Sequence, residues 1–429
     1  MKFRNCVFLG ASGLIALGFT MAMGVQGCGG SSAAPGVDSG ATGSTGSDAG
    51  ATGSTGTDAG ATGSDSGAAD AGPTGSDGGY VSAVPPSSPT GASPTSITTY
   101  HNFALHHVHL GDESDVNGLP DWYQYGYDID GLDTTKDSKA CTLYSGAPTT
   151  NQEDGPGGVD NSFGKNIVST LLQGIVNNPS QTVTNAIVAG HFTVMMDILG
   201  LNPAANTSAT GLTGALFGGV SFAQAPNAAN ATPTFTLTDN WPIDPAYIVG
   251  HPDSGTPLTP PISATITFTG AYQNNGVFVS GSYTDVTLSI QLEGQNLQIP
   301  IQHAIITANI PGAGDDGGAP SGTHAASGII AGVIDAQTLE MNVQGVAGSL
   351  STEFCNASDF ATIGKEILQA ADIMDDGTNV AGTPCNGISV GIGFDADEIM
   401  LPQVVGTPTV GPNPCATDAG PADAGATDQ

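Results

Sequence analysis

The sequence predicts a β-rich α+β fold, an antiparallel sheet or sandwich with a few packed amphipathic helices. Two observations support this prediction. Several stretches alternate apolar and polar residues with a period of two, whereas few stretches repeat apolar residues at helical spacing. A strand that alternates in this way has one face for a core and one for water, as antiparallel sheets commonly do.

A hairpin is the clearest element. Residues 286–292 and 297–301 both alternate, and Gly294-Gln295-Asn296 between them has the composition of a turn. A change of phase between His303 and Ile306 predicts a β-bulge. Further strands, the first two more clearly marked than the others, are predicted at residues 192–198, 262–268, 216–222, 234–237, 277–283, 305–310 and 325–334.

Three helices are expected. Residues 167–176 carry an apolar stripe at i, i+4 and i+8, with residues 160–162 as a possible cap. Residues 363–374 form a second stripe, for which Ser358 is the expected N-cap. Asp335 is placed to cap a third helix.

Composition divides the chain into four parts. Residues 1–27 have the features of a signal segment, and residues 28–95 read as a disordered tether rich in Gly, Ser, Thr and Asp. Residues 96–410 are the predicted globular domain, and residues 411–429 repeat the composition of the tether. The ten-residue repeat that begins at Gly40 has no apolar face, so it predicts a linker and not a solenoid.

The chain is strongly acidic. It has 39 Asp and Glu against six Lys and Arg, a formal net charge of −33. Beyond residue 27 the basic residues are Lys136, Lys139, Lys165 and Lys365 alone. This balance opposes binding to nucleic acid or to an anionic membrane surface and suits divalent cations. The alternative is an acidic exported surface without a specific ligand.

Four cysteines lie beyond residue 28, an even number that predicts disulfides in an exported chain. We expect Cys355 to pair with Cys385 around the last helix, which leaves Cys141 with Cys415. No C-x-x-C spacing occurs, so a nucleophilic or metal-binding cysteine is the less favoured interpretation.

The N-terminus combines Lys2 and Arg4, an apolar run from Val7 to Val25, and the tetrapeptide Val25-Gln26-Gly27-Cys28. This arrangement resembles a bacterial lipoprotein signal. The resemblance implies cleavage before Cys28, lipidation of that cysteine and attachment to a membrane through the lipid. Gly29 stands where an Asp would imply retention in the inner membrane, so the resemblance favours the outer membrane or cell surface. An uncleaved anchor or an ordinary signal peptide are the alternatives.

Acidic residues and glycines are concentrated between Asp112 and Asp160, where alternate aspartates can direct several oxygens toward one hard cation. The EF-hand pattern fails, because its first position would be Gly126 and its twelfth Asp137. A looser calcium loop remains, and the alternative is a solvated turn region. The predicted calcium ligands are Asp128, Asp130, Asp133 and Asp154.

Four of the eight histidines fall within nine residues, at His101, His106, His107 and His109. If this segment is extended, His107 and His109 share a face and are candidate ligands for zinc or copper. No HExxH motif or Cys/His ligand set accompanies them, so a polar surface segment is the alternative.

Residues 387–391 match the G-x-S-x-G pattern of serine hydrolases, with Ser389 as the would-be nucleophile. That motif requires a strand before the serine and a helix after it. The residues that follow, Ile392 to Asp395, read as a strand, so we expect a chance match and no catalytic residue.

The chain also resembles uncharacterised acidic surface lipoproteins of myxobacteria-like bacteria. The resemblance is carried by the tether and by residues 154–164, 370–377, Cys385 and 387–391. It implies an export route and not an activity. The favoured hypothesis is a lipid-anchored surface protein with a non-catalytic binding or structural domain, with calcium as its only expected cofactor. A secreted hydrolase, metal- or serine-dependent, and a carrier of hydrophobic ligands are the alternatives.

Overall fold

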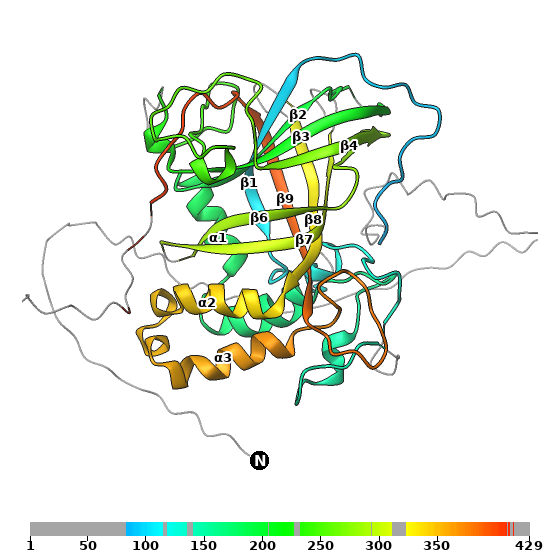
Figure 1. The fold of residues 1–429 in the computed structure, drawn as a ribbon, viewed down its shortest axis with the longest axis vertical. Helices are drawn as coiled ribbons and strands as arrows, with labels where there is room; N and C mark the ends of the chain where they lie inside the picture. The colour runs from blue at the N-terminus through cyan, green and yellow to red at the C-terminus, as the bar shows by residue number, and fades with distance from the viewer. Residues whose placement is uncertain are drawn as a thin grey trace, which may run out of the picture. The chain divides into compact units, whose positions relative to one another are not determined.

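The computed structural model confirms a β-rich α+β fold (Figure 1). It describes residues 83–411 and Cys415, apart from residues 115–117, 135–139, 205, 227–231, 293, 311–322 and 410. The signal segment, Cys28 and most of the predicted tether and tail therefore lie outside the described residues. The strands are β1 (Tyr100–His109), β2 (Thr193–Leu199), β3 (Ala209–Gly219), β4 (Ile266–Asn274), β5 (Val277–Val279), β6 (Thr284–Leu292), β7 (Gln295–Asn309), β8 (His324–Asp335) and β9 (Gly387–Ile399).

These strands form one antiparallel sheet in the order β5-β4-β3-β2-β1-β9-β8-β7-β6, which closes on itself because β5 also pairs with β7. Strands β6 and β5 pair with the same edge of β7: residues 295–304 of β7 pair with β6, and residues 307–309 pair with β5. The register of β7 against β8 shifts between Gln302 and Ile305, and His303 has a φ of 50°. The predicted bulge is therefore confirmed, and it lies where β7 changes partner.

The predicted β6–β7 hairpin is confirmed, as are the strands at 192–198 and 325–334. The strand predicted from residue 262 begins only at Ile266. The prediction of a strand at residues 234–237 was wrong. Those residues form a turn, because the carboxylate of Asp239 accepts hydrogen bonds from the backbone N–H groups of Thr234 and Phe235 at 2.6 Å.

Three α-helices are present: α1 (Pro179–Val188), α2 (Ala336–Leu350) and α3 (Ala357–Gln369). Asp335 caps α2 as predicted, since its carboxylate accepts from the N–H of Thr338 at 2.8 Å. The cap of α3 is Asn356 and not Ser358. The stripe predicted from residue 167 forms a π-helix, Phe163–Leu171, and α1 was not predicted.

The cap of the π-helix comes from the predicted residues 160–162, through Asn161 and not Ser162. Ser162 occupies the N-cap position but makes no capping bond, because its hydroxyl donates to the carbonyl of Ala370 at 2.6 Å. The side chain of Asn161 caps the helix, because its Oδ1 accepts from the N–H of Gly164 at 2.9 Å.

The main core lies on the inner face of the sheet and extends to the helices. Alternate residues of β1, such as Phe103 and Leu105, are buried there together with Phe394 of β9. Helices α2 and α3 lie side by side beneath the β6–β7 hairpin, and their apolar faces continue this core (Figure 1). Strands β1 and β9 are the first and the last along the chain, yet they pair with each other in the middle of this strand order.

Residues 83–95, which composition assigns to the tether, lie along the domain. The carbonyl of Ala83 accepts from the N–H of Asp128 at 2.7 Å, and that of Pro86 accepts from the hydroxyl of Tyr272 at 2.6 Å. Thr95 bonds through its hydroxyl to the carbonyl of Gly200. The ordered domain therefore includes at least the last 13 residues of the predicted tether.

The four cysteines form two disulfides, as expected, but the predicted pairing was wrong. Cys141 is bonded to Cys385, and Cys355 to Cys415. The segment around Cys141 runs beside residues 383–385, where Thr142 exchanges backbone hydrogen bonds of 2.7 and 2.9 Å with Thr383 and Cys385. Backbone pairing between distant segments, and not proximity along the chain, brings these two cysteines together.

Candidate functional site

Histidines of β1 lie beside carboxylates of β9, His101 on the inner face of the sheet to which Phe103 also points and His106 on the outer face. His101 Nδ1 lies 2.7 Å from Glu398 Oε1, and His106 Nδ1 lies 2.9 Å from Asp397 Oδ2. His324 of β8 reaches the other oxygen of Asp397 at 2.8 Å. The histidine segment is therefore neither coil nor a peripheral surface feature, because it forms the strand at the centre of the sheet.

A bulge in β1 places His107 and His109 on this outer face. Pairing with β9 skips from Leu105 to His107, so the alternation of side chains changes phase at His106. Ala104 packs outside before the bulge, whereas Val108 packs into the inner core after it. Without the extra residue, regular alternation would direct His107 and His109 toward the core.

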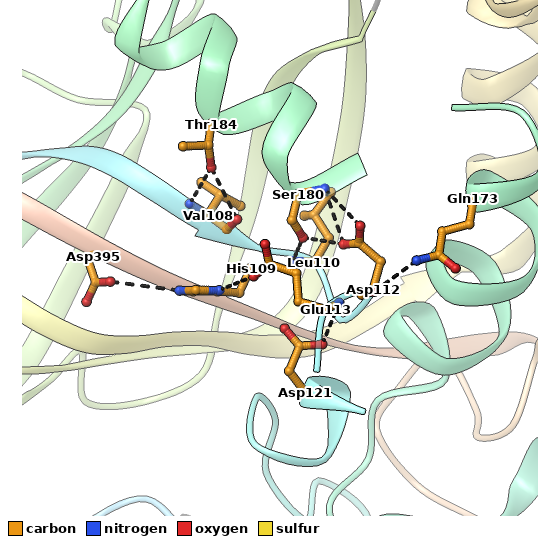
Figure 2. Close-up of polar contacts among 10 residues, drawn as sticks. All are labelled: Val108, His109, Leu110, Asp112, Glu113, Asp121, Gln173, Ser180, Thr184 and Asp395. Atoms are coloured by element: carbon orange, nitrogen blue, oxygen red, sulfur yellow. Dashed lines mark hydrogen bonds and ion pairs between the residues drawn. The ribbon is translucent and has the colours of Figure 1, made fainter. Parts of the chain in front are cut away.

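His109 lies between two carboxylates (Figure 2). Its Nδ1 is 2.9 Å from Oε2 of Glu113, and its Nε2 is 3.8 Å from Oδ2 of Asp395. The rings of His107 and Tyr125 stack on it, with centroids at 4.3 and 4.9 Å. Neighbouring interactions thus restrain the imidazole of His109 on its two faces and at both nitrogens.

Gly393 of β9 makes room for this arrangement. A Cβ atom at that position would overlap the ring of Tyr125, so only glycine lets the tyrosine lie flat on the sheet beside His109. The backbone of Tyr125 is held by Asn161, whose side-chain amide donates to its carbonyl at 2.7 Å.

The two histidines differ in their electrostatics. Burial and the neighbouring His109 lower the pKa of His107. Burial alone would also lower the pKa of His109, but its interactions with Asp395 and Glu113 outweigh burial and raise it. Asp121 lies beneath Glu113, and burial together with the charge of Glu113 raises its pKa to about 6.

A second cluster consists of carboxylates alone. Asp128, Asp130 and Asp160 each offer one oxygen, and these oxygens lie within 4.8 Å of one another. Calcium binds oxygens at about 2.3–2.6 Å, so two ligands on opposite sides of the ion are about 4.8 Å apart. Asp160 is 1% exposed; its Oδ2 accepts from the N–H of Ile129 at 2.7 Å, while its Oδ1 has no hydrogen-bond partner among the described residues.

Two more carboxylates adjoin Asp160, the half-buried Asp154 and the buried Asp372. The side chain of Asp154 lies within hydrogen-bonding reach of it, although neither group carries a donor when both are ionised. Asp372 is 4% exposed, and its charge also acts on both. Burial and mutual repulsion raise the pKa of Asp154 and of Asp160. Burial raises the pKa of Asp372 to about 7.

No lysine or histidine forms a direct ion pair with these aspartates within the described residues. The ammonium of Lys165 interacts with the charges of Asp154 and Asp372 at longer range, but its hydrogen bonds go to the carbonyls of Thr150 and Glu153, both at 2.6 Å. The ion pairs found in the described part of the chain all involve the histidines of β1 and β8.

The structure brings together some of the residues that the sequence suggested. Asp128 and Asp130 belong to the carboxylate cluster, Asp154 adjoins it, and Asp133 is exposed outside it. Sequence reasoning did not assign Asp160 to the calcium site, nor Glu113 to the histidines. The spacing His-x-His-x₃-Glu from His107 to Glu113 was the signal available for the latter.

Ser389 does not occupy a nucleophile elbow. It lies within strand β9, is fully buried, and donates through its hydroxyl to Oδ2 of Asp372 at 2.5 Å. The same hydroxyl accepts from the N–H of Ser162. Both bonds hold the π-helix and the segment before β9 together, which is a structural role.

An apolar cavity of about 40 Å³ lies between the π-helix, α2, α3 and the β6–β7 hairpin, lined by residues that include Leu171, Val343 and Phe354. An engineered cavity that binds benzene is about 150 Å³. The cavity is therefore too small, in this conformation, for a ligand of that size.

No family model, curated protein or solved structure matches the chain. Among the helices of the described residues, none combines the length and the apolar character needed to cross a bilayer.

Proposed function

We propose that this chain is an exported, lipid-anchored protein of the cell envelope whose β-rich domain has a non-catalytic binding or structural role and is stabilised by calcium. The carboxylate cluster supports the calcium part of this proposal. A buried oxygen of Asp160 without a donor, beside three other aspartates, is unfavourable unless a cation or a proton compensates it.

Calcium suits this site better than a transition metal. All the ligands are hard carboxylate oxygens, and the two that belong to Asp128 and Asp130 come from one turn, whereas calcium accepts variable coordination geometry. Three carboxylates give up to six oxygens if each is bidentate, and calcium takes six to eight. The ion would tie the turn at 128–131 to Asp160, and so to the start of the π-helix.

Thermal unfolding of the full-length chain in calcium and in chelator tests this proposal. Calcium should raise the Tm of the wild type, because an ion at 100 times its Kd stabilises the folded state by about 2.7 kcal/mol. Asp160→Asn should abolish the shift and be at least as stable as the wild type in chelator, since it removes one repelling charge. Asp133→Asn, an exposed aspartate of the same loop, is the matched control and should keep the full shift.

Two results would contradict the calcium proposal: a wild-type Tm that does not respond to calcium, or an equal calcium shift in Asp160→Asn. In the second case the ion would bind elsewhere on this acidic chain.

The location has a separate test. Disulfides persist in oxidising compartments, and the two found here support export. Cys28→Ser should move the protein from the membrane fraction to the soluble fraction, because a lipoprotein cysteine carries the anchor. Membrane association that survives this substitution would indicate an uncleaved N-terminal segment instead.

A further inference from the structure

We propose that His107, His109 and Glu113 form a site for a divalent transition-metal ion of the zinc class, separate from the carboxylate cluster. One ligand atom of each residue lies within 4.8 Å of the other two. Two imidazole nitrogens and one carboxylate oxygen are a common zinc ligand set, which leaves a fourth position open.

The contact between His109 and Glu113 is already close to that of two ligands on one ion. Nδ1 of His109 and Oε2 of Glu113 are 2.9 Å apart. Two ligands at 2.0–2.2 Å from a tetrahedral ion lie about 3.4 Å apart, so the pair must open by about half an ångström. Glu113 is on a loop with its side chain 35% exposed, which makes that movement easy.

Asp395 lies at the other nitrogen of the His109 ring, opposite Glu113. With a metal at Nδ1, the proton of His109 must sit on Nε2, which faces Oδ2 of Asp395 at 3.8 Å. Metal-binding histidines usually direct the other ring N–H at a carboxylate, which fixes the tautomer. Asp395 is itself positioned, because its other oxygen accepts from the N–H of Ser327 at 3.0 Å.

A buried carboxylate without a full set of partners provides independent support. Asp121 is 4% exposed, and its Oδ1 accepts from the backbone N–H of Glu113 at 3.0 Å. Its Oδ2 has no hydrogen-bond partner among the described residues. Figure 2 shows this side chain beneath Glu113, on the side of His109. A cation held by Glu113 and His109 would compensate that charge.

The third ligand, His107, requires a rotation. Its ring stacks on that of His109 with 19° between the planes, so the two rings do not yet direct their nitrogens at one point. The torsion that turns an imidazole about its Cβ–Cγ bond is broad, so the rotation gives up mainly the stacking contact between the two rings. No hydrogen bond involving the His107 side chain opposes it within the described residues.

Zinc titration of the metal-stripped, full-length chain by calorimetry tests the site, with calcium present so that the carboxylate cluster does not compete. The wild type should bind one zinc ion. His107→Ala and Glu113→Gln should each weaken binding at least about tenfold, and Asp395→Asn, which changes a positioning residue, by about 10- to 100-fold. His251→Ala, an exposed histidine far along the chain, is the control and should leave the affinity unchanged.

A second readout separates loss of ligands from loss of fold. Cobalt(II) in a tetrahedral site absorbs strongly in the visible, and this band should appear in the wild type and be lost in Glu113→Gln, whose near-ultraviolet circular dichroism without metal should match the wild type. A wild type that binds no zinc would overturn the proposal. So would zinc binding that neither His107→Ala nor Glu113→Gln weakens, because the ion would then sit at other histidines.

Discussion

Replacing Asp197 by asparagine should stabilise the domain at neutral and alkaline pH and have little effect in acid. Asp197 lies in β2, is 6% exposed, and its Oδ1 has no hydrogen-bond partner among the described residues. Burial raises its pKa from 3.8 to about 7, despite the opposing influence of His101. The folded protein therefore holds a proton on Asp197 over a range in which the unfolded chain has released it.

The direction and magnitude of the change in the free energy of unfolding follow from this difference in proton binding. Between about pH 3.8 and pH 7 the folded state binds the extra proton, so the free energy of unfolding falls as the pH rises. Each pKa unit is worth about 1.36 kcal/mol, so a shift of about three units costs about 4 kcal/mol once the pH exceeds 7. Below about pH 3.8 the carboxyl is neutral in both states and resembles the amide that replaces it.

Urea unfolding at a series of pH values measures this effect. The stability of Asp197→Asn minus that of the wild type should grow by about 4 kcal/mol between pH 3.5 and pH 8. Asp253→Asn, which removes an exposed charge, controls for the change in net charge and should show no comparable trend. A stability difference between the two proteins that does not change with pH, or that favours the wild type at pH 8, would refute the argument that burial raises the pKa of Asp197.

Three further variants, one of them with a matched control, test the fold. Replacing Cys141 and Cys385 together by alanine removes a link between positions 244 residues apart and should cost about 5 kcal/mol in denaturant unfolding, with a smaller loss arguing for residual structure in the unfolded chain. Asp335→Ala should cost about 1 kcal/mol by removing the cap of α2, and an unchanged urea midpoint would argue against the cap. Gly393→Ala should cost about 1–3 kcal/mol, because its methyl group overlaps the tyrosine ring beneath it, and it should also weaken zinc binding. Gly345→Ala, in open space on α2, is its control and should stabilise the protein by up to about 1 kcal/mol in the same assay.

The elements that the sequence predicted correctly are those specified by local pattern. The β6–β7 hairpin has alternation in both strands and a turn between them, and Asp335 has the chemistry of a cap. Strand β1 lacks such a signal, because the bulge at His106 breaks its alternation and its histidines look like surface residues. Helix α1 was missed because it is short and only weakly amphipathic.

The candidate sites were only partly predictable for a different reason. Asp128 and Asp130 are close in sequence, so their spacing could suggest a cation loop. Asp160 joins them only because its segment pairs with Tyr127, and Asp395 reaches His109 only because β9 lies beside β1. Such contacts between distant segments leave no trace in the spacing of one sequence. The disulfide pairing failed for the same reason.

The central position of β9 has a consequence for when the domain can fold. Strand β1 begins at Tyr100 and β9 ends at Ile399, yet the two are neighbours in the middle of the sheet. A chain emerging from a ribosome or a translocation pore exposes the inner edges of β1 and β8 until nearly all of the domain has appeared. Contacts of such large sequence separation form slowly, and open strand edges favour aggregation. Truncation before residue 387 should therefore leave a chain without a closed sheet, and folding should be completed only after β9 has been synthesised.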